Sequence, residues 1–174
     1  MYEIFADLHI HIGRSENGKP IKITGARSLN FANIAKECCE RKGIQVAGII
    51  DCASPYVIED IEKFLKTGDA YELQDGGIIY KDKVCILLGS EVETSEKGRN
   101  GKSGSAHNIC FFPYLKDIKG FSNELSKHVK NITLSTQRSD LSGYDLVDIV
   151  EKYNGIVIPA HIFTPHKSYY GNCT

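Results

Sequence analysis

The sequence lacks the marks of several protein classes. It has no C-x-x-C pair, no apolar run approaching the ~18 residues that a membrane span needs, and no basic segment followed by an apolar one at its start. We therefore expect no disulfide framework, zinc finger, membrane span or secretion signal, and a reducing cytoplasm is the default location. Positive charge is not in excess either, because the formal net charge is -1. Binding to nucleic acid would have to come from local basic patches.

Short β-like runs alternate with helical patterns along the 174 residues, which amount to about one domain. Strands are expected over residues 4–9, 46–50, 84–90, 107–112 and 155–161, and helices over 28–41, 57–66, 121–130 and 144–153. Because these strands are near-continuous runs of Val, Ile and Leu, the pattern predicts a mainly parallel α/β sheet or barrel. Segment 94–106 is rich in Gly, Ser and charge and predicts a loop, either a lid or disordered.

Side chains of metal-binding types fall at the ends of the expected strands. Two histidines close the first strand in "ADLHIH", and residues i and i+2 of a strand point to the same face. Because the carboxyl ends of parallel strands meet at one rim, distant residues would converge there. The residues at these strand ends are His9, His11, Asp51, Cys52, Glu91, His107 and His161. His107 opens its strand, so it converges only if that strand runs the other way or is approached through the preceding loop.

This set of imidazoles and carboxylates predicts a metal site that suits zinc, manganese or iron better than calcium or magnesium alone. A lone histidine at a strand end is more often a hydrogen-bonded structural residue. A whole set of such groups is harder to place in a core, because each unpaired buried polar group costs ~1–3 kcal/mol. Glu93, on the same face as Glu91, is an alternative ligand or a general base. His128 and His166 lie outside the pattern, and a solvated helix face is expected for His128.

Five motifs carry a resemblance to a known family. "ADLHIH", "IIDCASP", "LLGSEVE", "AHNICFFP" and "PAHIFTPHKSYYG" resemble the successive motifs of the polymerase-and-histidinol-phosphatase (PHP) metal-dependent phosphoesterases. "KITGAR" and "SKHVKNITLSTQRSD" resemble the endonuclease Q branch. The resemblance implies a distorted (β/α)7 barrel with metals on its rim and cleavage of DNA on the 5′ side of deaminated bases or abasic sites. We expect the metal to be zinc, with manganese or magnesium as alternatives.

The resemblance also assigns roles to single residues. The expected metal ligands are His9, His11, Glu91, His107 and His161. Glu91 corresponds to a glutamate that bridges metals, and Asp7 to a partner that fixes the tautomer of an imidazole. Many PHP enzymes have a histidine at the position of Cys52, so Asp51 and Cys52 are possible ligands only. The closing Asp-x-His motif is absent, so we expect residues 1–174 to be an N-terminal portion of a PHP domain without its closing strands.

A basic segment follows the histidines of the first strand. Its cations, opposed by one glutamate, are Arg14, Lys19, Lys22 and Arg27. They predict either a grip on the phosphates of DNA or an ordinary solvated loop.

Three functions remain open from the sequence. The first is a metal-dependent endonuclease of DNA repair, the second a small-molecule phosphoesterase of the histidinol-phosphatase type, and the third an inactive metal-binding fragment. The basic segment favours the first over the second, because a small ester needs one or two cations. The missing closing motif favours the third for residues 1–174 alone.

Overall fold

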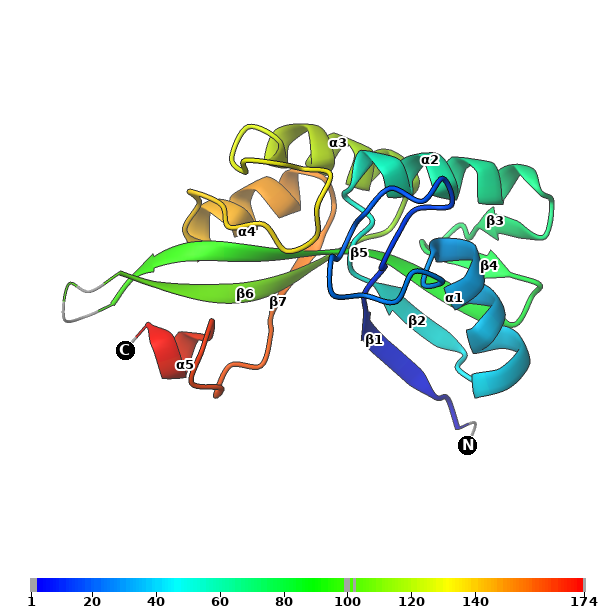
Figure 1. The fold of residues 1–174 in the computed structure, drawn as a ribbon, viewed down its shortest axis with the longest axis horizontal. Helices are drawn as coiled ribbons and strands as arrows, with labels where there is room; N and C mark the ends of the chain where they lie inside the picture. Colours follow the sequence, from blue (N-terminus) through cyan, green and yellow to red (C-terminus); the bar gives the residue numbers. More distant parts are fainter. Residues whose placement is uncertain (1–2, 99–100, 102, 174) are drawn as a thin grey trace.

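The computed structural model describes residues 3–98, 101 and 103–173, and its centre is one mixed β-sheet (Figure 1). Within these residues the sheet has seven strands. They are β1 (Ala6–Ile10), β2 (Val46–Ile49), β3 (Ala70–Glu72), β4 (Ile78–Tyr80), β5 (Val84–Lys97), β6 (Ser103–Phe112) and β7 (Ile156–Pro159). The helices are α1 (Phe31–Glu37), the π-helix η1 (Cys38–Lys42), α2 (Pro55–Lys66), α3 (Leu115–Leu125), α4 (Gly143–Lys152) and α5 (Tyr169–Asn172).

β5 is the central strand and pairs with three others. β1, β2 and β5 are parallel neighbours in that order. The remaining pairs are antiparallel: β3 with β4, β4 with the start of β5, β6 with the rest of β5, and β7 with β6. The expectation of a mainly parallel sheet is therefore wrong, because hairpins rather than helical crossovers lead into and out of β5. The sheet of the described residues is open, so the (β/α)7 barrel implied by the resemblance is not confirmed.

β5 and β6 form a longer hairpin than the sequence predicted. β5 continues to Lys97 and β6 begins at Ser103, so most of segment 94–106, predicted as a loop, is strand. Thr94 and Ala106 pair across the hairpin, and both are fully buried. Because this pair is buried, the segment is stabilised in an extended conformation, which its polar composition does not predict. Residues 99, 100 and 102 lie outside the described part.

The helices agree with the sequence pattern except at their ends. α2 has Pro55 in its first turn, where the missing N–H costs nothing. α1 begins after Asn30, whose side chain accepts the N–H of Asn33, and is shorter than predicted. α3 was predicted over residues 121–130 and instead spans Leu115–Leu125, because its buried face starts before the residues used for the prediction.

The short strands β3 and β4 were not predicted from the sequence.

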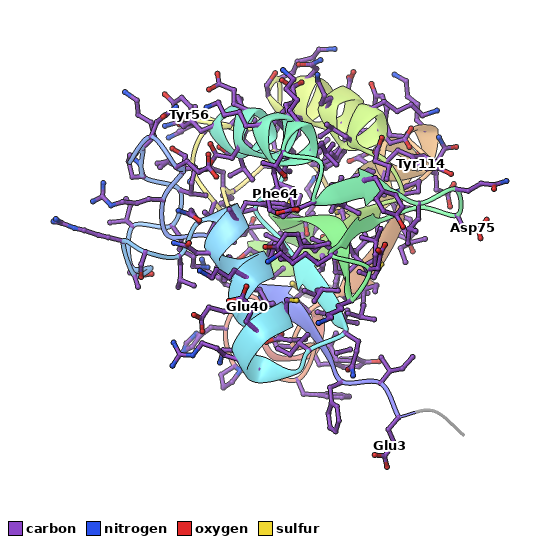
Figure 2. The ribbon with its side chains drawn as sticks, turned by 90° about the vertical axis from the view of Figure 1, so that its right-hand side faces the viewer. Glu3, Glu40, Tyr56, Phe64, Asp75 and Tyr114 are labelled. Carbon is purple, nitrogen blue, oxygen red and sulfur yellow. The ribbon has the colours of Figure 1, made fainter. Side chains whose placement is uncertain are left out.

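The main core lies between the sheet and the helices α2, α3 and α4, which run along one face of it (Figure 1). Phe64 of α2, labelled in Figure 2, lies where α1, α2 and β4 meet. The centroid of its ring is 5.3 Å from that of Phe31 and 5.1 Å from that of Tyr80. This packing ties α1 and α2 to β4, which pairs with the start of β5, the strand that carries Glu91 of the site described below.

All six cysteines are free thiols. Among the described residues, no helix combines the length and the apolar character required to cross a membrane.

Candidate metal centre

The structure brings the five predicted metal ligands to one place on the sheet. His9 lies in β1, His11 follows it directly, and Glu91 lies within β5. His107 lies in the middle of β6 opposite Glu93, and because β6 is antiparallel to β5, His107 reaches the same place. β7 is antiparallel to β6 and therefore parallel to β5, so His161, just beyond its end, arrives there too. The condition that the sequence set for His107, a strand running the other way, is met.

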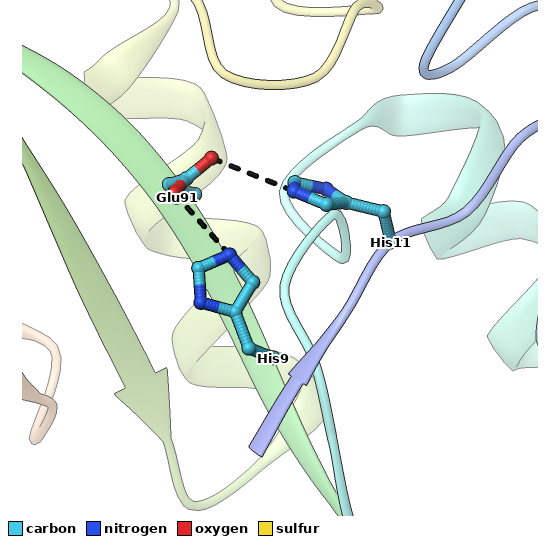
Figure 3. Close-up of side chains that lie close together, drawn as sticks. All are labelled: His9, His11 and Glu91. Carbon is cyan, nitrogen blue, oxygen red and sulfur yellow. Dashed lines mark ion pairs between the residues drawn. The ribbon is translucent and has the colours of Figure 1, made fainter. Parts of the chain in front are cut away.

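The carboxylate of Glu91 is the centre of this cluster, and its two oxygens face different imidazoles (Figure 3). His9 Nε2 lies 3.4 Å from Oε1, and His11 Nε2 lies 3.6 Å from Oε2. His107 Nδ1 lies 3.1 Å and His161 Nε2 lies 3.9 Å from Oε1. One carboxylate is thus shared by four histidines.

These side chains form two overlapping groups with the spacing of metal ligands. His9, His11 and Glu91 make one group, and Glu91, His107 and His161 make the other. Within each group, one donor atom per residue lies within 4.8 Å of the others. Imidazole nitrogen and carboxylate oxygen are donors that zinc and other first-row transition metals accept. The donor set therefore fits divalent metal, with Glu91 common to both groups.

Glu91 is ionised in this setting although it is buried. Burial alone would raise the pKa of its carboxyl, but hydrogen bonds with His107, His9 and Thr136 outweigh burial and hold the pKa well below its usual range. Thr136 Oγ1 donates to Oε2 at 2.7 Å. The cluster therefore offers a fixed negative charge to a cation.

Asp51 supports His11 and belongs to neither ligand group. Its Oδ2 accepts the backbone N–H of Ile12 at 2.7 Å and lies 3.1 Å from His11 Nδ1. An ionised carboxylate only accepts, so Nδ1 of His11 carries the proton and Nε2 presents its lone pair, which accepts from Lys22 Nζ in this structure and is the atom that would bind metal. The resemblance gave this supporting role to Asp7, but the contact recorded for the Asp7 carboxylate is with the backbone N–H of His9, at 3.2 Å. Asp51 is the carboxylate placed for that role.

Cys52, named as a possible ligand, lies outside both groups. It is fully buried in the main core, and its thiol donates to the carbonyl oxygen of Ile49 at 3.1 Å. Burial raises the pKa of this thiol, so it stays protonated. The chain turns inward after β2, which takes this side chain into the core. His128 was expected on a solvated helix face outside the site. It does lie outside both ligand groups, but in the turn after α3, where it is half-buried and its Nδ1 lies 2.9 Å from Asp140 Oδ1.

Glu93 also lies outside both ligand groups. It is 7% exposed, pairs with Lys167 at 2.8 Å, and its Oε2 lies 3.6 Å from His107 Nε2. Glu93 therefore faces the nitrogen of His107 that points away from Glu91, and it belongs to neither ligand group.

Lys22 is the member of the basic segment that reaches the cluster. Its Nζ lies 2.7 Å from His11 Nε2 and 4.0 Å from Glu91 Oε2. The other three cations lie elsewhere on the same loop, and they are Arg14, Lys19 and Arg27. Lys19 and Arg27 are exposed, and Arg14 donates to a carbonyl oxygen within the loop. The structure thus places one of the four cations at the site, and no contact with the ligand cluster is recorded among the described residues for the other three.

Two hydroxyl residues at the site, Ser135 and Thr136, were missed from the sequence. Ser135 Oγ donates to Asp51 Oδ1, while Thr136 donates to Glu91, so this loop holds both buried carboxylates. Thr136 has a φ of 50°, a rare conformation for a β-branched residue. Such strain persists only where the surroundings hold it, often at functional sites. The only signal in the sequence was the motif "STQRSD", quoted for its resemblance alone.

No protein-family model matches the chain. Two curated proteins are similar to it over most of its length. Uncharacterized protein YqxK of Bacillus subtilis (strain 168) is 49% identical over 171 residues, and the match covers 98% of this chain and 43% of that protein. Uncharacterized protein MJ0043 of Methanocaldococcus jannaschii is 27% identical over 160 residues, covering 91% of this chain and 16% of that protein. The chain therefore spans less than half the length of these relatives.

Two crystal structures share the fold. One is endonuclease Q in complex with a 27-mer duplex substrate with an abasic lesion at the active site, with a TM-score of 0.72 and 24% identity over 95% of this chain and 36% of that one. The other is the lesion-specific endonuclease PfuEndoQ from Pyrococcus furiosus, with a TM-score of 0.72 and 23% identity over 96% of this chain and 36% of that one. The chain thus has the fold of the corresponding part of these endonucleases.

Proposed function

We propose that this chain belongs to a metal-dependent DNA endonuclease of the endonuclease Q type, which cleaves on the 5′ side of deaminated bases or abasic sites and acts in DNA repair. The observation that carries the proposal is the convergence of four imidazoles on the ionised carboxylate of Glu91. The shared fold with an endonuclease Q crystallised on an abasic duplex supports the reaction class and the substrate. The six free thiols fit a reducing cytoplasm.

Among the described residues, some side chains would bind the metal and others would hold those ligands in orientation. His9, His11, His107 and His161 offer neutral imidazole nitrogens, and Glu91 offers a shared anionic oxygen. A divalent metal held here, zinc first and manganese or magnesium as alternatives, supplies polarisation of the phosphoryl oxygens and a water of lowered pKa. The supporting side chains Asp51 and Thr136 keep their partners oriented through hydrogen bonds.

Lys22 is the cation that the chain itself offers to the phosphate. Its side chain is 31% exposed while its ammonium lies beside the cluster, so a phosphate oxygen that approaches the ligands meets it. Lys19 and Arg27 are exposed on the same loop and extend positive charge away from the site. A small phosphate ester has no use for this extension, whereas the backbone of a DNA strand does. The loop therefore favours DNA over a histidinol-phosphatase type of substrate.

The experiment that tests the proposal compares substrates on the full-length protein. Duplexes containing uracil, hypoxanthine or an abasic site are incubated with metal beside an undamaged duplex and a small phosphate monoester. We expect cleavage of the damaged duplexes only, lost in His9→Ala and kept in His128→Ala, a histidine outside the cluster. For residues 1–174 alone we expect little or no nuclease activity.

Other outcomes would contradict the proposal in different ways. Turnover of the monoester without cleavage of any damaged duplex would make the protein a small-molecule phosphoesterase. Stoichiometric metal without either activity in the full-length protein would make it a metal-binding protein that is catalytically inactive.

A further inference from the structure

We propose that Glu93 is a positioning residue that holds the imidazole of His107 in the tautomer needed for metal binding, and that Lys167 holds Glu93 in turn. The proposal rests on the proposed function, since it assigns His107 as a ligand. It gives Glu93 a role different from the two that its spacing suggested, ligand or general base.

The starting observation is an unpartnered atom. His107 is 9% exposed, and its Nε2 is buried without a hydrogen-bond partner among the described residues. Buried polar groups are nearly always paired, and leaving one unpaired costs about 1–3 kcal/mol. The acceptor facing this nitrogen is Glu93 Oε2 at 3.6 Å, slightly beyond hydrogen-bond length. A small rotation of either side chain would complete the bond.

The two nitrogens of His107 have different surroundings, and this defines their roles. Nδ1 lies 3.1 Å from Glu91 Oε1, inside the ligand group with His161. Without metal, Nδ1 is hydrogen-bonded to Glu91. A ring nitrogen binds metal through its lone pair, so metal binding requires Nδ1 to be unprotonated and places the proton on Nε2. A carboxylate behind Nε2 accepts that proton's hydrogen bond, fixes this tautomer and makes the ligand more basic. Glu93 is the carboxylate in that place.

Lys167 holds Glu93 in position. Its Nζ lies 2.8 Å from Glu93 Oε2, and its backbone carbonyl accepts the N–H of His107 at 3.0 Å. One residue of the segment after β7 thus contacts both members of the pair. That segment also carries His161, so a member of the second ligand group and its support belong to the same stretch of chain.

The experiment measures zinc affinity and the solvent exchange of the His107 Nε2 proton in four variants of the full-length protein. Zinc affinity is measured by competition with a chromogenic chelator, and the Nε2 proton of His107 is followed in ¹H–¹⁵N spectra of the imidazole region. The variants are Glu93→Ala, Glu93→Gln and Lys167→Met, with Glu59→Ala as the matched control. Glu59 is an exposed glutamate on α2, far from the cluster in the sequence.

In Glu93→Ala we expect zinc affinity to fall about 10–100-fold, the effect typical of a lost partner behind a ligand. The Nε2 proton should become fast-exchanging. Glu93→Gln keeps a carbonyl oxygen to accept that proton and should restore both readouts, while Lys167→Met should show a smaller loss of affinity. Glu59→Ala should behave as wild type.

Unchanged zinc affinity in Glu93→Ala, with the wild type binding zinc, would overturn the positioning role and leave the proposed function standing. Equal losses in Glu93→Ala and Glu93→Gln would also overturn it, because they would make the charge itself, and hence direct ligation, the cause. A wild-type protein that binds no metal would instead refute the proposed function. Circular dichroism of each variant distinguishes these results from a failure to fold.

Discussion

Replacing Glu91 by glutamine should remove most of the metal affinity while leaving the shape of the site almost unchanged. Glutamine has nearly the same volume and can still accept the hydroxyl of Thr136, so the change removes the charge more than the packing. The lowered pKa of Glu91 means that the wild-type carboxylate is ionised at neutral pH, so the substitution removes a full negative charge there.

The magnitude follows from the position of Glu91 in both ligand groups. A contact made to a charged group contributes about 1.5–3 kcal/mol, and the carboxylate supplies one such contact in each group. Losing one such contact costs about 1.5–3 kcal/mol at each of the two metal positions. Since about 1.4 kcal/mol corresponds to a factor of ten, the Kd at each position should rise about tenfold to a hundredfold. His9→Ala, which affects one group, should cost less.

The assay is metal content by mass spectrometry on protein never exposed to a chelator, followed by titration with zinc. Glu59→Gln is the matched control, because it makes the same chemical change at an exposed glutamate of α2 outside both ligand groups and should bind zinc as the wild type does. Wild-type affinity in Glu91→Gln would refute the assignment of Glu91 as a shared ligand. Equal losses in the two variants would show that general electrostatics, and not ligation, explain the effect.

Three further changes have defined outcomes. Lys19→Ala combined with Arg27→Ala should lower the slope of log affinity for DNA against log salt concentration by about two units, equally for damaged and undamaged duplexes, and an unchanged slope would make the loop an ordinary solvated surface. Cys52→Ala should leave metal content unchanged and reduce the free energy of unfolding by about 1 kcal/mol, whereas loss of metal would restore Cys52 as a ligand. Asp60→Ala should reduce the free energy of unfolding in urea by about 1–3 kcal/mol, because the buried Asp60 carboxylate accepts the backbone N–H of Glu16, and Asp60→Asn, which keeps an acceptor, should cost less.

The sequence was most informative where periodicity and burial agree. β2 and α2 lie almost where their apolar patterns predicted them. Strand direction was not predictable, because a buried strand has the same apolar run whether its neighbour is parallel or antiparallel. The far half of the β5–β6 hairpin was missed for a related reason: Gly, Ser and charge suggested a loop, and only the partner strand makes such a segment extended.

The candidate site shows the same division. The clustering of His9, Glu91 and His161 was predicted from their expected places at strand ends, and the structure brings them together although Glu91 lies within the longer β5. Which carboxylate supports which imidazole did not follow, because the resemblance pointed to Asp7 while the contact to His11 comes from Asp51, which follows β2. Ser135 and Thr136 were invisible for a simpler reason, since hydroxyl residues in a loop are too common to mark a site.

His9 and His161 lie near opposite ends of the described chain, and this has a consequence for folding. The two side chains face the same carboxylate only after β1 has paired with β2 and β7 with β6. Both pairings join segments far apart in the sequence, so we expect them to form after the folding transition state. An unfolded chain therefore presents no comparable site, and metal at a hundred times its Kd should add about 2.7 kcal/mol to the native state. Contacts absent from the transition state change the unfolding rate and not the folding rate. Metal added to a refolding chain should accordingly leave the rate of folding unchanged and slow unfolding.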